Sequence, residues 1–253
     1  MNDEQTDGGA GPLELRIDAK TFVSADGASV EIVRGLNLRL EAGGFGAMIG
    51  PSGCGKTTIL HIAAGLDADF AGQRRVPGAR LGIVFQEPRL LPWRTVAENI
   101  RLVLPAHGSL DHGSLDDLAD LIETLGLGSH LAHYPGELSL GLARRVAIAR
   151  AFAVRPDFLL LDEPFVSLDE AVAGRLREEV AVLTERHRMT TLLVTHDLRD
   201  AVQLADRLFF LSARPASIVS ETSLPPPRRM RSKQAIDRIL EDLSTLPLSQ
   251  SAP

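Results

Sequence analysis

Residues 50–57, GPSGCGKT, have the residue types and spacing most suited to chemistry in this chain. They match the pattern GxxxxGK(S/T), and they lie between an apolar run that ends at Ile49 and another that begins at Ile59. A strand, a glycine-rich turn and a helix in this order gather backbone N–H groups and the positive end of a helix around phosphate oxygens. The pattern therefore predicts a nucleotide-binding turn. A glycine turn that matches by chance is the alternative, and the flanking strand and helix count against it.

Within this turn, Lys56 is expected to reach the β- and γ-phosphates, and the Thr57 hydroxyl is expected to bind Mg²⁺. The residues predicted to contact the nucleotide are Gly50, Pro51, Ser52, Gly53, Cys54, Gly55, Lys56, Thr57 and Thr58.

Two adjacent carboxylates end a second apolar run, FLLLDEP at 158–164. Ligands of α/β sheets bind at the carboxyl ends of the strands, so Asp162 and Glu163 are expected beside the phosphate-binding turn. Asp162 suits a Mg²⁺ ligand, and Glu163 can polarise a water for attack on the γ-phosphate. The alternative is a solvated acidic strand end that caps the next helix.

Two more polar side chains follow apolar runs. His196 ends LLVTH, and its imidazole can donate a hydrogen bond to a γ-phosphate. Gln86 follows LGIVF; its amide cannot act as a base, but it can orient a water or Mg²⁺. A histidine at a strand end is more often structural, and here its convergence with the other strand ends favours a functional role.

The elements that must position these residues alternate between strand and helix patterns, which is typical of an α/β fold with a parallel sheet. Alternating apolar residues at 13–17 and 36–40 predict an antiparallel edge layer. Buried strands are expected at 46–50, 81–85, 158–162 and 192–196, and helices over 115–125, 142–152 and 172–183.

Three segments fall outside this alternation. Residues 87–156 contain helical patterns but no core strand, so we expect an inserted helical subdomain there. Residues 1–12 are acidic, polar and glycine-rich, which indicates a disordered leader. Residues 213–253 are expected to form a tail, with an extended proline-bearing connector followed by a short helix at 235–243.

The composition excludes several classes of function. The chain has 253 residues, a formal net charge of −6 and a pI near 5.7, so no overall basic field is available to hold nucleic acid or an anionic membrane. The single cysteine, Cys54, cannot form an internal disulfide, which favours a reducing cytosol. No stretch has the roughly 18–20 apolar residues that span a bilayer, so a protein in transport would use other subunits as the pore.

These motifs together resemble the nucleotide-binding subunits of ABC transporters over residues 13–212. GPSGCGKT resembles Walker A, FLLLDEP resembles Walker B with its catalytic glutamate, and Gln86 resembles the Q-loop residue. Ser167 to Asp169 resemble the D-loop, which places Asp169 at the nucleotide, and His196 resembles the switch histidine. The resemblance implies an α/β P-loop NTPase cassette with a mixed sheet core, an N-terminal antiparallel β layer and an inserted helical subdomain.

The family's signature, LSGGQ, appears here as Leu138 to Leu142 in the sequence LSLGL. Ser139 and Gly141 keep their family identities, whereas Leu140 and Leu142 replace a glycine and a glutamine. The family works as a head-to-tail dimer, so Ser139 and Gly141 are expected at the partner's γ-phosphate, with Ser139 as the N-cap of a helix. If position 140 requires a positive φ, leucine costs about 1–2 kcal/mol and slows the site. A helix N-cap without nucleotide contact is the alternative for Ser139.

Two aromatic residues gain a role only from the resemblance. Phe22 lies where the family has an aromatic side chain that stacks on adenine, with core packing as the alternative. The run FQEPRLLPWRTVAENI at 85–100 is most similar to importers of nitrate, sulfonate and taurine, in which this stretch faces the membrane subunit. Trp93 is then either an exposed anchor for that contact or a buried residue of the helical subdomain.

The resemblance implies an ATPase that powers import of a small organic or inorganic anion, with ATP and Mg²⁺ as cofactors. The implied partners are a second copy of the chain, two transmembrane permease subunits and a periplasmic or extracellular substrate-binding protein, with no nucleic acid. The chain would lie at the cytoplasmic face of the cell membrane. The alternatives are a soluble ABC ATPase that acts on nucleic acid or a ribosome, and a P-loop kinase for a small molecule.

Overall fold

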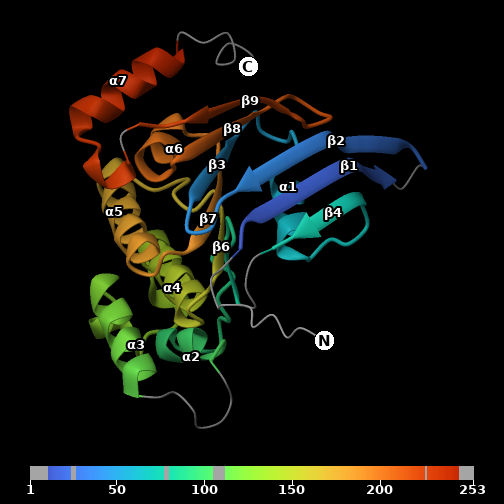
Figure 1. The fold of residues 1–253 in the computed structure, drawn as a ribbon. Coiled ribbons are helices and arrows are strands. Elements are labelled where there is room, and N and C mark those ends of the chain that lie inside the picture. Colours follow the sequence, from blue (N-terminus) through green and yellow to red (C-terminus); the bar gives the residue numbers. More distant parts are fainter. Residues whose placement is uncertain (1–10, 24–26, 77–79, 105–111, 226, 245–253) are drawn as a thin grey trace, which may run out of the picture.

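The computed structural model describes residues 11–23, 27–76, 80–104, 112–225 and 227–244, without the side chains of 112–116. Its strands form two sheets, a three-stranded sheet in the order β2-β1-β4 and a six-stranded sheet in the order β5-β6-β7-β3-β8-β9 (Figure 1). The strands of the smaller sheet are β1 Leu13–Val23, β2 Ser29–Leu40 and β4 Ala71–Arg75. Those of the larger sheet are β3 Phe45–Ile49, β5 Leu81–Val84, β6 Phe158–Asp162, β7 Thr190–Thr195, β8 Arg207–Leu211 and β9 Ile218–Ser223.

The larger sheet is mixed, as expected. Its first five strands pair in parallel, and β9 closes the edge antiparallel to β8. Every residue of β3, β6 and β7 is buried, which explains their continuous apolar sequences. The four core strands and the N-terminal antiparallel pair predicted from the sequence are all present, and the α/β class is confirmed. The expectation of full burial is wrong for β5, an edge strand of which only alternate residues are buried.

The helices cover the sheets and fill the interval between β5 and β6. Helices α2, α3 and α4 lie together in that interval (Figure 1, lower left), where the sequence predicts helices without a core strand. The α-helices are α1 Lys56–Ala64, α2 Val96–Arg101, α3 His112–Thr124, α4 Leu140–Ala153, α5 Glu170–Arg186, α6 Leu198–Leu204 and α7 Lys233–Ser244. Short 3₁₀ helices span Gly128–His130, Pro135–Glu137 and Arg228–Met230. The expected leader falls mostly on residues 1–10, outside the described residues.

Two apolar clusters lie on opposite faces of the six-stranded sheet. Alternate residues of β6 divide between them, Leu159 and Leu161 on the side of α4 and α5, and Phe158 and Leu160 on the side of α1 and the antiparallel sheet. This two-sided burial fixes the register of the central strands, because a shift by one residue exchanges the two faces. The carboxyl ends of these strands are thereby held in one row.

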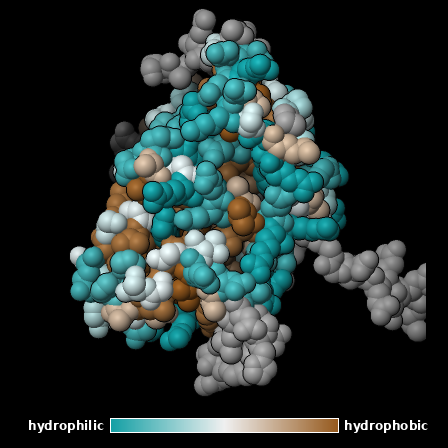
Figure 2. Space-filling view, turned by 90° about the vertical axis from the view of Figure 1, so that its left-hand side faces the viewer, coloured by the Kyte–Doolittle hydropathy of each residue, from teal (hydrophilic) through white to brown (hydrophobic). Residues whose placement is uncertain are grey.

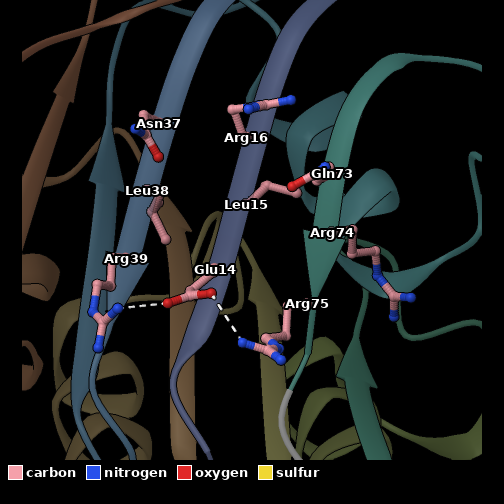
Figure 3. Close-up of a pocket in the computed structure, with 9 residues that line it drawn as sticks. All are labelled: Glu14, Leu15, Arg16, Asn37, Leu38, Arg39, Gln73, Arg74 and Arg75. Atoms are coloured by element: carbon pink, nitrogen blue, oxygen red, sulfur yellow. Dashed lines mark hydrogen bonds and ion pairs between the residues drawn. The ribbon is translucent and has the colours of Figure 1, made fainter.

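The outward face of the antiparallel sheet carries a shallow hollow of about 850 Å³ (Figure 3). Glu14 lies at its centre, 2.5 Å from the Arg39 guanidinium and 3.7 Å from that of Arg75, and Arg16 pairs with Asp18 at 3.4 Å. These arginines are already paired with carboxylates, so the hollow is not a strong anion site. It also lies away from the row of strand ends.

Candidate functional site

Four neighbouring strands bring the predicted site residues to one edge of the sheet. In the order β5-β6-β7-β3, Gln86 follows β5, Asp162 ends β6, His196 follows β7 and Gly50 follows β3. Because these strands are parallel, all four residues lie at their carboxyl ends. The convergence predicted from the sequence is therefore present, and it places the site where α/β sheets bind ligands.

The glycine-rich turn depends on its glycines for conformation and for space. Gly53 has φ 72° and Gly55 has φ 125°, both in the region that side chains other than glycine rarely adopt. A Cβ on Gly55 would also lie 2.8 Å from Cγ2 of Ile32, so the turn packs directly against β2. Lys56 is 6% exposed, and its Nζ donates to the carbonyl oxygens of Gly50 at 2.7 Å and Pro51 at 3.0 Å. The ammonium thus lies inside the turn, where it can meet a phosphate.

Two other side chains shape this turn. Arg214, from the segment after β8, donates to the carbonyl oxygen of Gly53 at 2.5 Å. Burial raises the pKa of the Cys54 thiol, which opposes formation of a thiolate. Cys54 is therefore a packed residue of the turn and not a nucleophile.

A hydroxyl and a carboxylate meet at the start of α1. The Thr57 hydroxyl donates to Oδ1 of Asp162 at 3.4 Å, and Asp162 is 3% exposed. Burial raises the pKa of Asp162, and the hydrogen bond from Thr57 opposes that shift. These oxygens suit Mg²⁺, which takes one or two protein oxygens together with substrate phosphates. Among the described residues, no cluster of three or more His, Cys, Asp or Glu side chains could hold a metal alone. A Mg²⁺ ion at Thr57 and Asp162 would leave its other positions to water or phosphate oxygens.

Glu163 is held in an unusual backbone conformation. Its φ is 47°, in the left-handed region, and its N–H donates to the carbonyl oxygen of Val194 at 2.9 Å. Its Oε2 lies 2.6 Å from Nδ1 of His196, and the glutamate side chain is 13% exposed. A carboxylate oriented by an imidazole at the end of a strand can act as a general base toward a water. Left-handed residues other than glycine are concentrated at functional sites, which agrees with that chemistry.

The loop after Glu163 leads into α5. Ser167 also has a positive φ, 61°, and Asp169 is the N-cap of α5, its Oδ1 accepting from the N–H of Val172 at 3.0 Å. The loop is thus fixed at its carboxyl end by a helix cap. This places Asp169 at the start of α5.

The N-terminus of α4 carries the residues of the signature segment. Ser139 is its N-cap, and the Ser139 hydroxyl accepts from the N–H of Leu142 at 3.3 Å. Leu140 is the first residue of the helix, and it is not one of the left-handed residues of the described chain. The strain considered for leucine at position 140 therefore does not arise here. A Cβ on Gly141 would lie 3.0 Å from Cγ1 of Val172, so glycine allows α4 and α5 to approach closely.

The two aromatic residues are both exposed. Phe22 is 46% exposed, with the Lys20 ammonium 4.7 Å from the centroid of its ring. Trp93 is 71% exposed. The core-packing alternatives for both residues are therefore wrong. Gln86 is exposed as well, beyond the end of β5.

Two residues of the site were not identified from the sequence. Arg144, on α4, donates to the carbonyl oxygens of Glu163 and Pro164. Asp200, on α6, the helix that follows His196, accepts a hydrogen bond from the Thr195 hydroxyl at 3.2 Å and lies 3.5 Å from the Arg177 guanidinium. Burial raises the pKa of Asp200 to about 7, with a smaller contribution from the charge of Asp197. The sequence pattern gives no signal for these contacts, because each joins segments that are distant along the chain or follows from burial.

The chain is similar in sequence to ATP-binding proteins of transport systems. The family model described as "ABC transporter" matches residues 33–166. The aliphatic sulfonates import ATP-binding protein SsuB 2 of Pseudomonas syringae pv. tomato is 41% identical over 87% of this chain and 91% of that protein. The SsuB protein of Bacillus cereus strain ZK is 40% identical over 85% of this chain and 88% of that protein. The bicarbonate transport ATP-binding protein CmpC of Synechocystis is 40% identical over 83% of this chain and 33% of that protein.

Solved structures agree with the fold. A dimeric post-hydrolysis structure of the ATP-binding cassette MJ0796 bound to ADP and phosphate has a TM-score of 0.73 and 26% identity, covering 85% of this chain and all of that one. A second dimeric structure of the same cassette, described as a bacterial ABC transporter cassette, has a TM-score of 0.73 and 25% identity, with the same coverage.

Proposed function

This chain belongs to the ABC transporter family, and we propose that it is the ATP-hydrolysing subunit of an importer of small anions. The observation that carries the proposal is the meeting of the glycine-rich turn, Asp162, Glu163 and His196 at the ends of neighbouring strands. That arrangement supplies a phosphate cradle, a cation site and a base, which are the parts that transfer of a phosphoryl group to water requires.

We assign the roles within the site as follows. The backbone N–H groups of residues 52–58 and the Lys56 ammonium bind the phosphates of ATP, with Gly50 and Pro51 lining the turn, and Phe22 stacks on its adenine. Thr57, Gln86 and Asp162 hold Mg²⁺, which neutralises charge on the phosphates when it is bound. Glu163 accepts a proton from the attacking water, and His196 orients the Glu163 carboxylate.

Two copies of the chain would complete two such sites. Ser139 and Gly141 lie at the N-terminus of α4, whose free N–H groups and dipole attract an anion. The two MJ0796 structures are dimers, one of them with ADP and phosphate. We therefore place Ser139, Gly141 and Asp169 of one copy at the nucleotide of the other, as in the family's head-to-tail dimer.

The membrane partner would bind the helical region between β5 and β6. Exposed apolar side chains gather there, and Figure 2 shows apolar surface in the lower half of the side that carries α3 and α4. The exposed large apolar side chains of that region are those of Trp93, Tyr134, Leu140, Leu102 and Val103. No helix in the described parts of the chain combines the length and apolar character needed to cross a bilayer. We propose that this surface docks a pair of permease subunits at the cytoplasmic face of the membrane.

The proposed substrate is a small organic or inorganic anion. The relatives are named for import of aliphatic sulfonates and for transport of bicarbonate, and a single negative charge on a small molecule is what these substrates share. We propose that the anion is delivered by a separate binding protein outside the membrane. Its identity would be set by that protein and the permease, since none of the site residues described above faces the solute.

Two measurements test the proposal. The purified chain should release phosphate from Mg·ATP with no acceptor molecule present, which a small-molecule kinase would not do. It should also co-purify with a membrane protein of several spans, and a soluble ABC ATPase that acts on a ribosome or nucleic acid would not. Absence of phosphate release in the presence of the permease would contradict the proposal.

A further inference from the structure

Arg144 is a buried cation on α4 that binds only backbone oxygens. The residue is 5% exposed, and its Nη1 donates to the carbonyl oxygens of Glu163 at 3.0 Å and Pro164 at 2.6 Å. Both acceptors belong to the turn that follows β6. The contact therefore joins the helix that begins at Ser139 to the backbone of the proposed base.

Stability alone does not account for an arginine at this position. Among the residues that the structure describes, no carboxylate forms an ion pair with Arg144, and its Nε is buried without a hydrogen-bond partner. Burial lowers the pKa of the Arg144 guanidinium, because the charged form is desolvated. The negative charge of Glu163 opposes that shift of the pKa but is the smaller influence. A buried cation that is not hydrogen-bonded to an anion usually destabilises a fold relative to an apolar side chain of similar size. The carbonyl contacts are thus the feature that only a long cationic donor provides.

Those contacts hold the backbone of Glu163, which bears the proposed base and has a strained conformation. A residue other than glycine in the left-handed region lies about 1–2 kcal/mol above its preferred conformation, and Glu163 has φ 47°. Its N–H is fixed by the carbonyl oxygen of Val194 on β7, and its carbonyl oxygen is fixed by Arg144. Holding both peptide groups directs the side chain of Glu163 toward His196, at 2.6 Å.

The same helix repeats this arrangement about 1.7 turns later, at Arg150. Arg150 donates to the carbonyl oxygens of Pro88 and Arg89, both at 2.9 Å, and Arg89 also has a positive φ of 47°. That loop carries Gln86. Arg145, between the two, instead pairs with Glu179 on α5 at 3.1 Å and donates to the carbonyl oxygen of Leu125 at 3.3 Å, and neither of these partners in the described part of the chain belongs to the site. Helix α4 therefore holds two loops at the edge of the sheet by guanidinium-to-carbonyl contacts.

We infer that Arg144 is a positioning residue for Glu163, which it keeps in the left-handed conformation that aims the carboxylate at the attacking water. The inference rests on the proposed role of Glu163 as the base. In the described structure Arg144 donates to Glu163 and Pro164 and not to residues 50–58. A change at Arg144 should therefore alter the rate of ATP hydrolysis and leave the affinity for ATP unchanged.

The test is Arg144→Met, with Arg145→Met as the matched control on the same helix. Arg144→Met should lower kcat for ATP hydrolysis by at least about tenfold, equivalent to about 1.4 kcal/mol, with an unchanged KM for ATP. Arg145→Met should keep kcat within about twofold while losing at least as much thermal stability as Arg144→Met, since it leaves the largely buried Glu179 without its ion-pair partner. Arg144→Lys, which keeps the charge but can reach only one of the two carbonyl oxygens, should lower kcat by more than twofold, though by less than Arg144→Met.

A second measurement separates positioning from general disruption of α4. In a Glu163→Gln background, Arg144→Met should still form the ATP-dependent dimer, because Ser139 at the start of the helix is unchanged. A kcat within twofold of wild type in Arg144→Met would overturn the inference, and so would an equal loss in Arg145→Met or loss of the dimer. If Arg144→Met does not fold, a wild-type kcat in Arg144→Lys overturns it. Wild-type turnover in Glu163→Gln alone would instead refute the proposed base.

Discussion

Replacing Glu163 with glutamine removes a base while leaving the shape of the site intact. Glutamine has the size of glutamate, and its amide oxygen can still accept a hydrogen bond from His196, which lies 2.6 Å from the present carboxylate. The backbone bonds of residue 163 to Val194 and Arg144 involve no side-chain atom of this residue. The substitution therefore changes basicity and little else.

The expected effect follows from what a positioned base contributes. General-base catalysis is worth roughly 10²- to 10⁴-fold in rate, which corresponds to about 2.7–5.4 kcal/mol in the activation free energy. Glu163 contacts neither Lys56 nor Thr57 among its hydrogen-bond partners in the described structure. The Kd for Mg·ATP should consequently stay within about threefold of wild type, and bound ATP should persist.

The assay is steady-state phosphate release together with equilibrium binding of a fluorescent ATP analogue and size measurement of the ATP-bound protein. Glu178→Gln is the matched control, because it makes the same chemical change on the exposed face of α5. Glu163→Gln should lose turnover by at least a hundredfold and accumulate as an ATP-bound dimer, while Glu178→Gln behaves as wild type. A kcat within threefold of wild type in Glu163→Gln would refute the assignment of the base.

Lys56→Ala should weaken ATP binding by roughly 10- to 150-fold, the value of one hydrogen bond to a charged group, as measured by isothermal titration, and an unchanged Kd would contradict the phosphate cradle. Burial raises the pKa of Asp200 to about 7, so the folded protein binds this proton more tightly than the unfolded chain does. The free energy of unfolding of the wild type should therefore fall as the pH rises from about 4 to about 7. Asparagine cannot lose this proton, so the free energy of unfolding of Asp200→Asn in urea should rise relative to that of wild type between pH 4 and pH 8, by about 4 kcal/mol at most. A difference between the two proteins that does not change with pH would contradict the raised pKa. Trp93→Ala should weaken association with the permease by about 30-fold or more, as expected for an exposed aromatic anchor, without changing ATP affinity; co-purification at wild-type yield would place the contact elsewhere.

Much of the site could be predicted from the sequence because its residues follow strands whose burial is visible as apolar runs. Gly50, Asp162 and His196 each end or follow such a run, and the parallel order of the strands then brings them together. The helices α4 and α5 were predictable for a similar reason, since their apolar residues recur at helical spacing.

Elements held by backbone pairing or by long-range contacts could not be predicted in this way. Strand β4 is exposed along its whole length, so its pairing with β1 leaves no apolar pattern. Strand β9 lies where the sequence indicates only an extended connector, because its residues are half buried at the sheet edge. Arg144 is buried by helix packing, and nothing in a run of arginines distinguishes it from Arg145.

The conformation at position 140 shows the same limit. The signature segment of the family suggested that leucine could be strained there, but the structure begins α4 at Leu140 with ordinary helical geometry. The strain of this site lies instead at Glu163 and Ser167, which no residue type in the sequence marks.

The most direct test of the central claim is uptake into vesicles that contain the permease with this chain, enclosing Mg·ATP on the side of the chain. A labelled alkanesulfonate or bicarbonate and the binding protein are supplied outside. The account predicts that the anion accumulates only with ATP and with the wild-type chain, and that Glu163→Gln abolishes accumulation. Accumulation that continues without ATP, or with Glu163→Gln, would contradict it.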